Sequence, residues 1–231
     1  MRLCLAIAVS LSVAAPACAQ DRPKGVIELF TSQGCSSCPA ADRILGDLAR
    51  DSSLVALSLP VDYWDYIGWK DTLATPAMTA RQKDYAATRG DGQVYTPQAV
   101  IDGVTHVVGS DRGAIGAALA EHAGALAVEV DAKTSNGRIA VDAGAGPERR
   151  GGVWLVEAQP QATVAVGRGE NAGRTLVYVN VVRRMTRLGD WNGAAVHFET
   201  TVAGDGGEFF ALVQAGAANR PGAILGAARA R

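Results

Sequence analysis

The chain has 231 residues, a formal net charge of −1 and 48% hydrophobic residues. This length is enough for one large packed domain or two small ones, and the composition excludes a disordered protein. The near-neutral charge gives no electrostatic reason to expect nucleic acid or an anionic membrane as a partner.

The N-terminus has the pattern of an export signal. Arg2 is a minimal positive region, residues 3–15 are an apolar run too short to span a bilayer, and residues 17–19 (Ala-Cys-Ala) form a small-residue cleavage site. We therefore expect residues 1–19 to be a signal peptide and the mature protein to be periplasmic or secreted, with no membrane association after cleavage. A lipoprotein anchored at Cys18 is the alternative.

The next segment, residues 26–42, holds the most informative pattern in the chain. Residues 26–30 are typical of a buried strand, and a short polar turn leads to Cys35 and Cys38 at the start of a helix. A helix N-terminus favours a thiolate, because its free N–H groups and dipole lower the pKa of a cysteine below about 8.5. Pro39 fits the first helical turn. This spacing therefore indicates a redox-active pair.

The cysteine count supports that interpretation. Cys4 and Cys18 fall in or beside the predicted signal, so the mature protein would hold only Cys35 and Cys38. Disulfides persist in exported proteins. A bridge across so short a loop constrains little of the unfolded chain, so this spacing suits reversible exchange better than stabilisation.

Glu28 interrupts the otherwise apolar strand of residues 25–31. Its carboxylate is either exposed at an edge or buried with a raised pKa. A buried carboxylate beside a dithiol can accept the proton of the second thiol. Glu28 is therefore a catalytic candidate beside Cys35 and Cys38, with a solvent-facing position as the alternative.

A helix over residues 40–50 and a strand over residues 54–61 come next. A strand, a helix and a strand with short connections predict two parallel strands. The segment that follows, residues 62–70, would then leave the carboxyl end of the second strand, where ligands bind in open α/β sheets. It is unusually aromatic, and its rings are candidates for a substrate-binding wall or for a plug over the sheet edge: Tyr63, Trp64, Tyr66 and Trp69.

The first half of the chain ends with two further helices and a hairpin. Thr75-Pro76 predicts the start of a helix over residues 76–89. Residues 99–101 and 104–108 should be paired strands, and residues 111–124 a helix.

From residue 126 onward, short alternating runs are separated by turn residues, which is typical of a β sandwich. The expected strands are residues 126–130, 139–141, 153–156, 163–166, 176–182, 196–201, 209–213 and 224–227. We therefore expect two domains after the signal, an α/β domain over residues 20–124 and an all-β, sandwich-like region over residues 125–231.

The order of elements in residues 20–124 resembles the thioredoxin fold. In that fold a cis-proline loop faces the dithiol, and Thr96-Pro97 matches this element. The resemblance implies a cis bond before Pro97, a role for Pro97 in the site, and substrate docking at Thr96. The resemblance also places Glu28 near a buried acid of that fold, but one residue further from the first cysteine.

Three longer segments resemble a family of exported bacterial proteins known as domain of unknown function 1223. They are E-L-F-T-S-Q-G-C-S-S-C-P-A-A-D from Glu28, V-D-Y-W-D-Y-I-G-W-K-D from Val61 and Y-T-P-Q from Tyr95, with N-V-V-R from Asn180 as a weaker fourth match. The resemblance covers nearly all of the mature chain and implies a thioredoxin-like fold without a substrate.

These patterns favour an exported thiol–disulfide oxidoreductase that needs no cofactor and acts on a protein, or a small molecule, containing thiols or disulfides. A binding protein with an inert disulfide is the first alternative. Copper(I) binding by Cys35 and Cys38 is the second. A closed zinc site is not expected, because His106, His122 and His197 are far apart in sequence.

Overall fold

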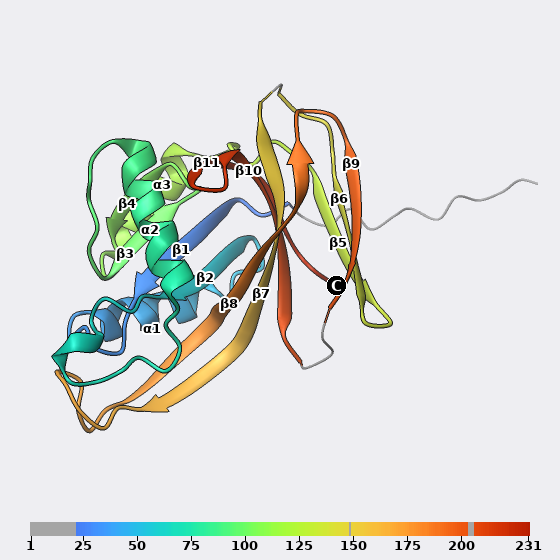
Figure 1. Cartoon of the computed structure of the whole chain (residues 1–231). Helices are drawn as coiled ribbons and strands as arrows, with labels where there is room; N and C mark the ends of the chain where they lie inside the picture. The colour runs from blue at the N-terminus through green and yellow to red at the C-terminus, as the bar shows by residue number, and fades with distance from the viewer. Residues whose placement is uncertain (1–21, 148, 203–205) are drawn as a thin grey trace, which may run out of the picture.

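The computed structural model describes residues 22–147, 149–202 and 206–231 (Figure 1). The predicted signal peptide, residues 1–19, lies outside the described residues. In the described part of the chain, no helix is long and apolar enough to cross a bilayer.

The described residues form three α-helices, one 3-10 helix and eleven strands. The helices are α1 (Cys38–Leu48), η1 (Asp65–Ile67), α2 (Pro76–Arg89) and α3 (Arg112–Glu121). The strands of the first half are β1 (Gly25–Thr31), β2 (Leu54–Pro60), β3 (Gln98–Ile101) and β4 (Thr105–Val108). Those of the second half are β5 (Val130–Ser135), β6 (Arg138–Ala143), β7 (Gly151–Ala165), β8 (Thr175–Trp191), β9 (Val196–Thr201), β10 (Glu208–Ala217) and β11 (Arg220–Arg229).

The first half follows the local sequence pattern closely. Every residue of β1 is buried, as its continuous apolar run predicts. β1 and β2 are parallel, which confirms the predicted strand–helix–strand unit. The bounds of α2 agree with the prediction. The Thr75 side chain caps its start by accepting a hydrogen bond from the N–H of Met78, and Gly90 ends it at a φ of 76°.

The predicted fold class, a thioredoxin-like α/β domain followed by a separate β sandwich, is wrong. One mixed sheet of eight strands runs in the order β11-β10-β7-β8-β2-β1-β3-β4, so it contains strands from both sides of residue 124. β8 lies beside β2, with Ser58 opposite Val181, and the Asn180 side chain donates to the carbonyl of Ala56 at 2.9 Å. The second half of the chain therefore extends the first sheet.

A long hairpin of β7 and β8 makes this extension possible. The runs 153–156 and 163–166 were expected as two strands, but they belong to one strand, β7. β7 pairs with β10 only as far as Ala158, so Pro160 lies where one edge of the strand is free and a missing N–H costs little. Figure 1 shows the hairpin reaching past β2 toward the end of the sheet near α1 and η1.

The large sheet is covered on both faces. On one face, α2 packs through Met78 and Tyr85 against residues such as Phe30 and Leu57. On the other face, α1 and α3 cover the β1–β3 end of the sheet. The same face of β7, β10 and β11 packs against the small sheet β5-β6-β9, with Trp191 buried in this second core.

Candidate functional site

Cys35 and Cys38 form a disulfide between the end of β1 and the start of α1, with their Cα atoms 5.4 Å apart. Cys38 is the first residue of α1 and Pro39 follows in the first turn, as the sequence predicts. Cys35 is 2% exposed and Cys38 is fully buried. Both cysteines are therefore almost completely buried, and the Ser37 hydroxyl lies 3.4 Å from the Cys35 sulfur.

The loop before Cys35 is held by the segment that follows β2. The N–H of Gln33 donates to the buried carboxylate of Asp71 at 2.7 Å, and the Gln33 side chain accepts from the indole N–H of Trp69 at 2.8 Å. Gln33 itself is fully buried. Trp69 therefore fixes the cysteine loop, and a role in docking stays a prediction.

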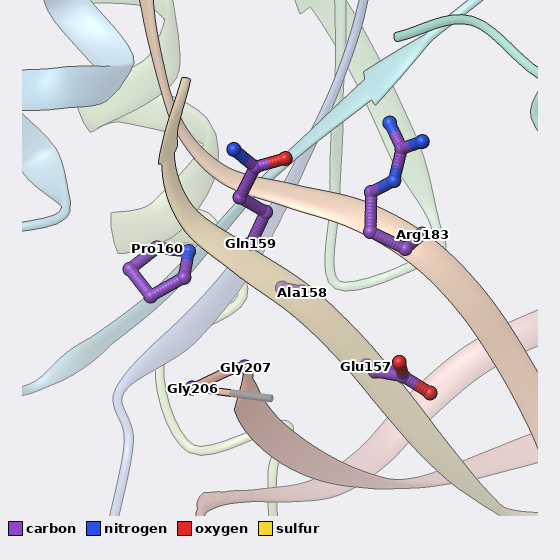
Figure 2. Close-up of a pocket in the computed structure, with 7 residues that line it drawn as sticks. All are labelled: Glu157, Ala158, Gln159, Pro160, Arg183, Gly206 and Gly207. Carbon is purple, nitrogen blue, oxygen red and sulfur yellow. The ribbon is translucent and has the colours of Figure 1, made fainter. Parts of the chain in front are cut away.

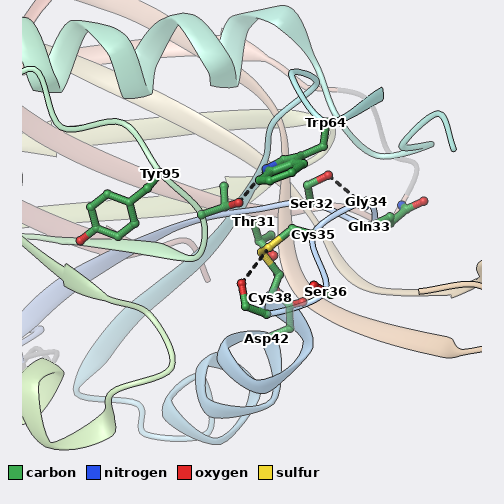
Figure 3. Close-up of a disulfide and its surroundings, with 12 residues drawn as sticks. Thr31, Ser32, Gln33, Gly34, Cys35, Ser36, Cys38, Asp42, Trp64 and Tyr95 are labelled. Atoms are coloured by element: carbon green, nitrogen blue, oxygen red, sulfur yellow. Dashed lines mark hydrogen bonds between the residues drawn. A yellow bond between two sulfur atoms is a disulfide. The ribbon is translucent and has the colours of Figure 1, made fainter. Parts of the chain in front are cut away.

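Trp64 is the predicted aromatic residue that lies beside the disulfide. A Cβ atom on Gly34 would come within 3.0 Å of the Trp64 Cβ, so the tryptophan covers the residue before Cys35. Figure 3 shows its ring close to Cys35. Tyr66 stacks on this ring with an interplanar angle of 13° and is 80% exposed. Tyr63 instead packs against the main core on the α2 side.

The Thr96–Pro97 peptide bond is cis, which confirms the prediction for this loop. The Thr96 hydroxyl accepts a hydrogen bond from the indole N–H of Trp64 at 2.7 Å. A Cβ atom on Gly109 would come within 3.3 Å of Pro97 and 3.2 Å of Ala41 in α1. The loop therefore lies close to both the aromatic segment and the helix that carries Cys38.

Glu28 does not join this site. Its neighbours Ile27 and Leu29 pack against α1, so the alternation of a strand turns the Glu28 side chain to the α2 face. There its two oxygens accept bonds from Arg81 at 2.7 and 3.1 Å, and one of them also accepts the Tyr85 hydroxyl. The carboxylate is fully buried rather than exposed at a sheet edge, on the face opposite the disulfide helix.

Asp42 was not among the predicted site residues, but it is the buried acid nearest in sequence to Cys38. Asp42 lies one helical turn after Cys38, is 5% exposed, and accepts a hydrogen bond from the Thr31 hydroxyl at 2.7 Å. Its second oxygen has no hydrogen-bond partner among the described residues. Figure 3 shows Trp64 and Asp42 on opposite sides of the disulfide.

Burial raises the pKa of the Asp42 carboxyl to about 8, while the hydrogen bond from Thr31 lowers it and the charge of Asp71 raises it further. Such a carboxyl is mostly protonated at neutral pH, with a pKa close to that of an ordinary thiol. The spacing of four residues from Cys38 on one helix was the available signal, because residues i and i+4 share a helix face.

The described residues hold no cluster of three or more histidine, cysteine or acidic side chains that could bind a metal ion. His106 bonds the Tyr95 hydroxyl at 2.8 Å, and His197 bonds Asp142 at 2.7 Å. These histidines have local partners that are unrelated to the disulfide. Copper(I) binding by Cys35 and Cys38 alone stays a prediction.

A pocket of about 330 Å³ lies on the paired strands β7 and β8, near Gly206 and Gly207. Figure 2 shows Glu157, Gln159 and Arg183 around it. It contains none of the predicted site residues. Its acidic and basic groups do not converge on one point, so we assign it no function.

Comparison with known proteins gives the family. The sequence matches the family described as "Protein of unknown function (DUF1223)" over residues 26–214. The chain belongs to this family. No curated protein matches the sequence.

Two solved structures are similar to this member of the DUF1223 family. A protein of Agrobacterium tumefaciens is 34% identical, with a TM-score of 0.81 over 91% of this chain and 95% of that one. HBP35 of Porphyromonas gingivalis has a TM-score of 0.60 over 91% of this chain and 75% of that one. At 12% identity, the second likeness concerns the fold alone.

Proposed function

We propose that the protein is a thiol–disulfide oxidoreductase that acts in the periplasm or outside the cell. The observation that carries this proposal is the position of the disulfide. It lies between a buried strand and a helix start, with Trp64 close to Cys35 and the cis Thr96–Pro97 loop hydrogen-bonded to Trp64. The apolar residues 3–15 and the small residues at 17–19 support export.

The proposed exchange starts at Cys35. A client thiolate attacks the Cys35 sulfur, the Cys35–Cys38 bond breaks, and Cys38 leaves as a thiolate that takes up a proton. A second client thiolate then attacks the mixed disulfide and releases the Cys35 thiolate. The client dithiol loses two electrons and the protein disulfide gains them, and the reverse sequence reduces a client disulfide.

Asp42 is the proton donor and acceptor in this proposal. Cys38 is fully buried, so an ionised sulfur there is costly unless a proton arrives as the bond breaks. Asp42 follows Cys38 by one turn, and its raised pKa of about 8 keeps a proton available at neutral pH. Asp42 also lines a groove of about 760 Å³ between α1 and the β7–β8 hairpin, through which solvent can resupply the proton.

The client docks on Trp64, Tyr66, Thr96 and Pro97 in this proposal. Tyr66 is largely exposed beside the half-buried Trp64. An exposed aromatic pair next to a reactive sulfur favours a peptide or small molecule with an apolar portion near its thiol. The partner class is a thiol-containing or disulfide-containing protein, or a small thiol such as glutathione.

Two cysteine variants test the proposal. Cys35→Ser should abolish exchange with glutathione and with a model protein disulfide. Cys38→Ser should retain Cys35 and accumulate a mixed disulfide, which mass spectrometry of the trapped species would identify. Full exchange by Cys35→Ser, or trapping that requires Cys38 instead, would refute the assigned roles.

The low exposure of the disulfide favours a second candidate, a binding protein with an inert disulfide. In that case the aromatic pair would hold a ligand, and the sulfurs would not react in the folded state. A redox titration separates the two functions. A potential below about −300 mV with no exchange toward glutathione would favour the inert disulfide.

A further inference from the structure

The tip of the β7–β8 hairpin, residues 166–174, is fastened to the cysteine loop. The Asn171 amide donates at 2.9 Å to the carbonyls of both Gln33 and Cys35, and Asn171 is fully buried. Arg174 donates to the other end of the same amide at 2.8 Å, which fixes its orientation. The hairpin of the second half therefore forms part of the surroundings of the disulfide.

Trp69 holds the tip from a second direction. A Cβ atom on Gly167 would meet the Trp69 ring at 3.1 Å, and one on Gly169 would meet the Trp69 Cβ at 3.3 Å. Gly169 also has a φ of +77°, which a residue with a side chain rarely adopts. Because Trp69 also donates to Gln33, it clamps the tip and the cysteine loop together.

This arrangement brings one carboxylate to the first of the two residues between the cysteines. The N–H of Ser36 donates to the Glu170 carboxylate at 3.2 Å. Other ionisable groups around the cysteine loop include the acid Asp71, the mostly protonated Asp42 with Arg43 near it, and the cation Arg174. Arg174 is committed to Asn171, so the charge placed on the Ser36 N–H is negative.

We propose that Glu170 is a positioning residue that holds down the thiolate fraction of Cys35 by placing a negative charge on the N–H of Ser36. The inference rests on the proposed function and concerns how the reactivity of the same site is regulated. A neighbouring carboxylate disfavours a second anion such as the Cys35 thiolate. Reduced Cys35 therefore reacts more slowly at neutral pH than a cysteine would at the same helix N-terminus without this carboxylate.

The solvent exposure of the two residues limits the size of the expected rate change. Ser36 and Glu170 are both exposed, so water and salt screen the repulsion. We expect Glu170→Gln, which keeps the hydrogen-bond acceptor and removes the charge, to raise the reaction rate of Cys35 about 2- to 5-fold at pH 6–7. The gain should shrink in 1 M salt, because the Debye length falls to about 3 Å.

The test is alkylation of the reduced mature protein by iodoacetamide across pH 5–10, with the Cys35 peptide quantified by mass spectrometry. Glu170→Asp, which keeps the charge, should follow the wild type, and so should Glu199→Gln in the small sheet. A Glu170→Gln profile that overlays the wild type, or an equal shift in Glu199→Gln, would overturn the proposal. A titration of thiolate absorbance at 240 nm checks the same shift without reagent access.

This measurement needs no exchange activity, so the two proposals fail separately. A protein that shows the Glu170→Gln shift but no exchange with glutathione would keep the charge effect and lose the oxidoreductase. A protein that exchanges normally but shows no shift would lose only the role of Glu170.

Discussion

Glu28 and Asp42 are buried carboxylates on opposite faces of the large sheet, and their surroundings differ in one respect. Glu28 accepts hydrogen bonds from two nitrogens of Arg81 and from the Tyr85 hydroxyl, and Gln214 in turn bonds Arg81 and Tyr85. Asp42 receives one neutral hydroxyl from Thr31 and has no cation within hydrogen-bond reach among the described residues.

This difference gives the two carboxylates different roles, one in holding elements together and one in proton transfer. Glu28 is paired with a guanidinium and joins β1 to α2, which carries both of its partners. A buried carboxyl without a cation keeps its proton, as the raised pKa of Asp42 shows. Asp42 can therefore give and take a proton near neutral pH, and it lies on the helix of Cys38.

The largest expected effect is on the pH dependence of stability. Unfolded Asp42 releases its proton near pH 4, but folded Asp42 holds it until about pH 8. Between these values the unfolded chain binds fewer protons, so rising pH favours unfolding. This one group should cost the wild type up to about 1.4 kcal/mol of unfolding free energy for each pH unit.

Urea unfolding of oxidised wild type and Asp42→Asn at pH 4, 6 and 8 measures this effect. Asparagine still accepts the Thr31 hydroxyl but does not titrate, so the variant should gain stability over the wild type as pH rises. Asp102 also has a pKa raised by burial, but it is common to both proteins and cancels, whereas Asp71 is electrostatically coupled to Asp42, so the difference between the two proteins reports on that pair. Parallel curves for the two proteins would show that Asp42 is ionised in the folded state.

The next effect is the loss of a charge partner on the α2 face. Arg81→Met leaves the fully buried Glu28 without its cation and should cost about 3–5 kcal/mol of unfolding free energy. The double variant Glu28→Gln/Arg81→Met removes both charges and should recover much of that loss, because the introduced glutamine side chain can still accept the Tyr85 hydroxyl. Equal destabilisation of the single and double variants would contradict a charge-pair role.

Exchange kinetics compares the two carboxylates directly. Asp42→Asn should slow the reduction of the disulfide at pH 7 by roughly 10²-fold, the lower end for loss of general acid–base catalysis. The double variant Glu28→Gln/Arg81→Met should exchange at the wild-type rate per folded molecule. Stopped-flow measurement with dithiothreitol reports both rates, and the reverse ranking would restore Glu28 as the proton acceptor.

The same two residues show how far the sequence could predict the site. The cysteine pair, its helix and the cis bond at Pro97 follow from local patterns. Glu28 was a reasonable candidate because it lies near the cysteines in the sequence. Whether its side chain points toward them depends on which face of β1 is covered by α1. Asp42 lies seven residues from Cys35 in the sequence, and its importance depends on burial that no local pattern reports.

The error in the fold class has a similar cause. The alternation of residues 176–182 correctly predicts a strand, but not its neighbour. β8 joins β2 through Ser58 and Val181, more than a hundred positions apart in the sequence, and the Asn180 amide replaces a strand hydrogen bond at the junction. Because strand pairing is a tertiary contact, period-two patterns could not distinguish an extended sheet from a separate sandwich.

The smallest expected effect concerns the docking side of the disulfide. Trp64→Phe removes the hydrogen bond from the indole N–H to the Thr96 hydroxyl and should cost about 1 kcal/mol of unfolding free energy. It should also raise the KM for a protein disulfide more than it lowers kcat, because the Thr96–Pro97 loop loses a support and the sulfurs do not. Tyr66→Phe is the matched control, since this exposed residue makes a stacking contact that phenylalanine keeps. A change in kcat alone for Trp64→Phe would place the tryptophan with Asp42 in the proton chemistry, and the two sides of the disulfide would no longer have separate roles.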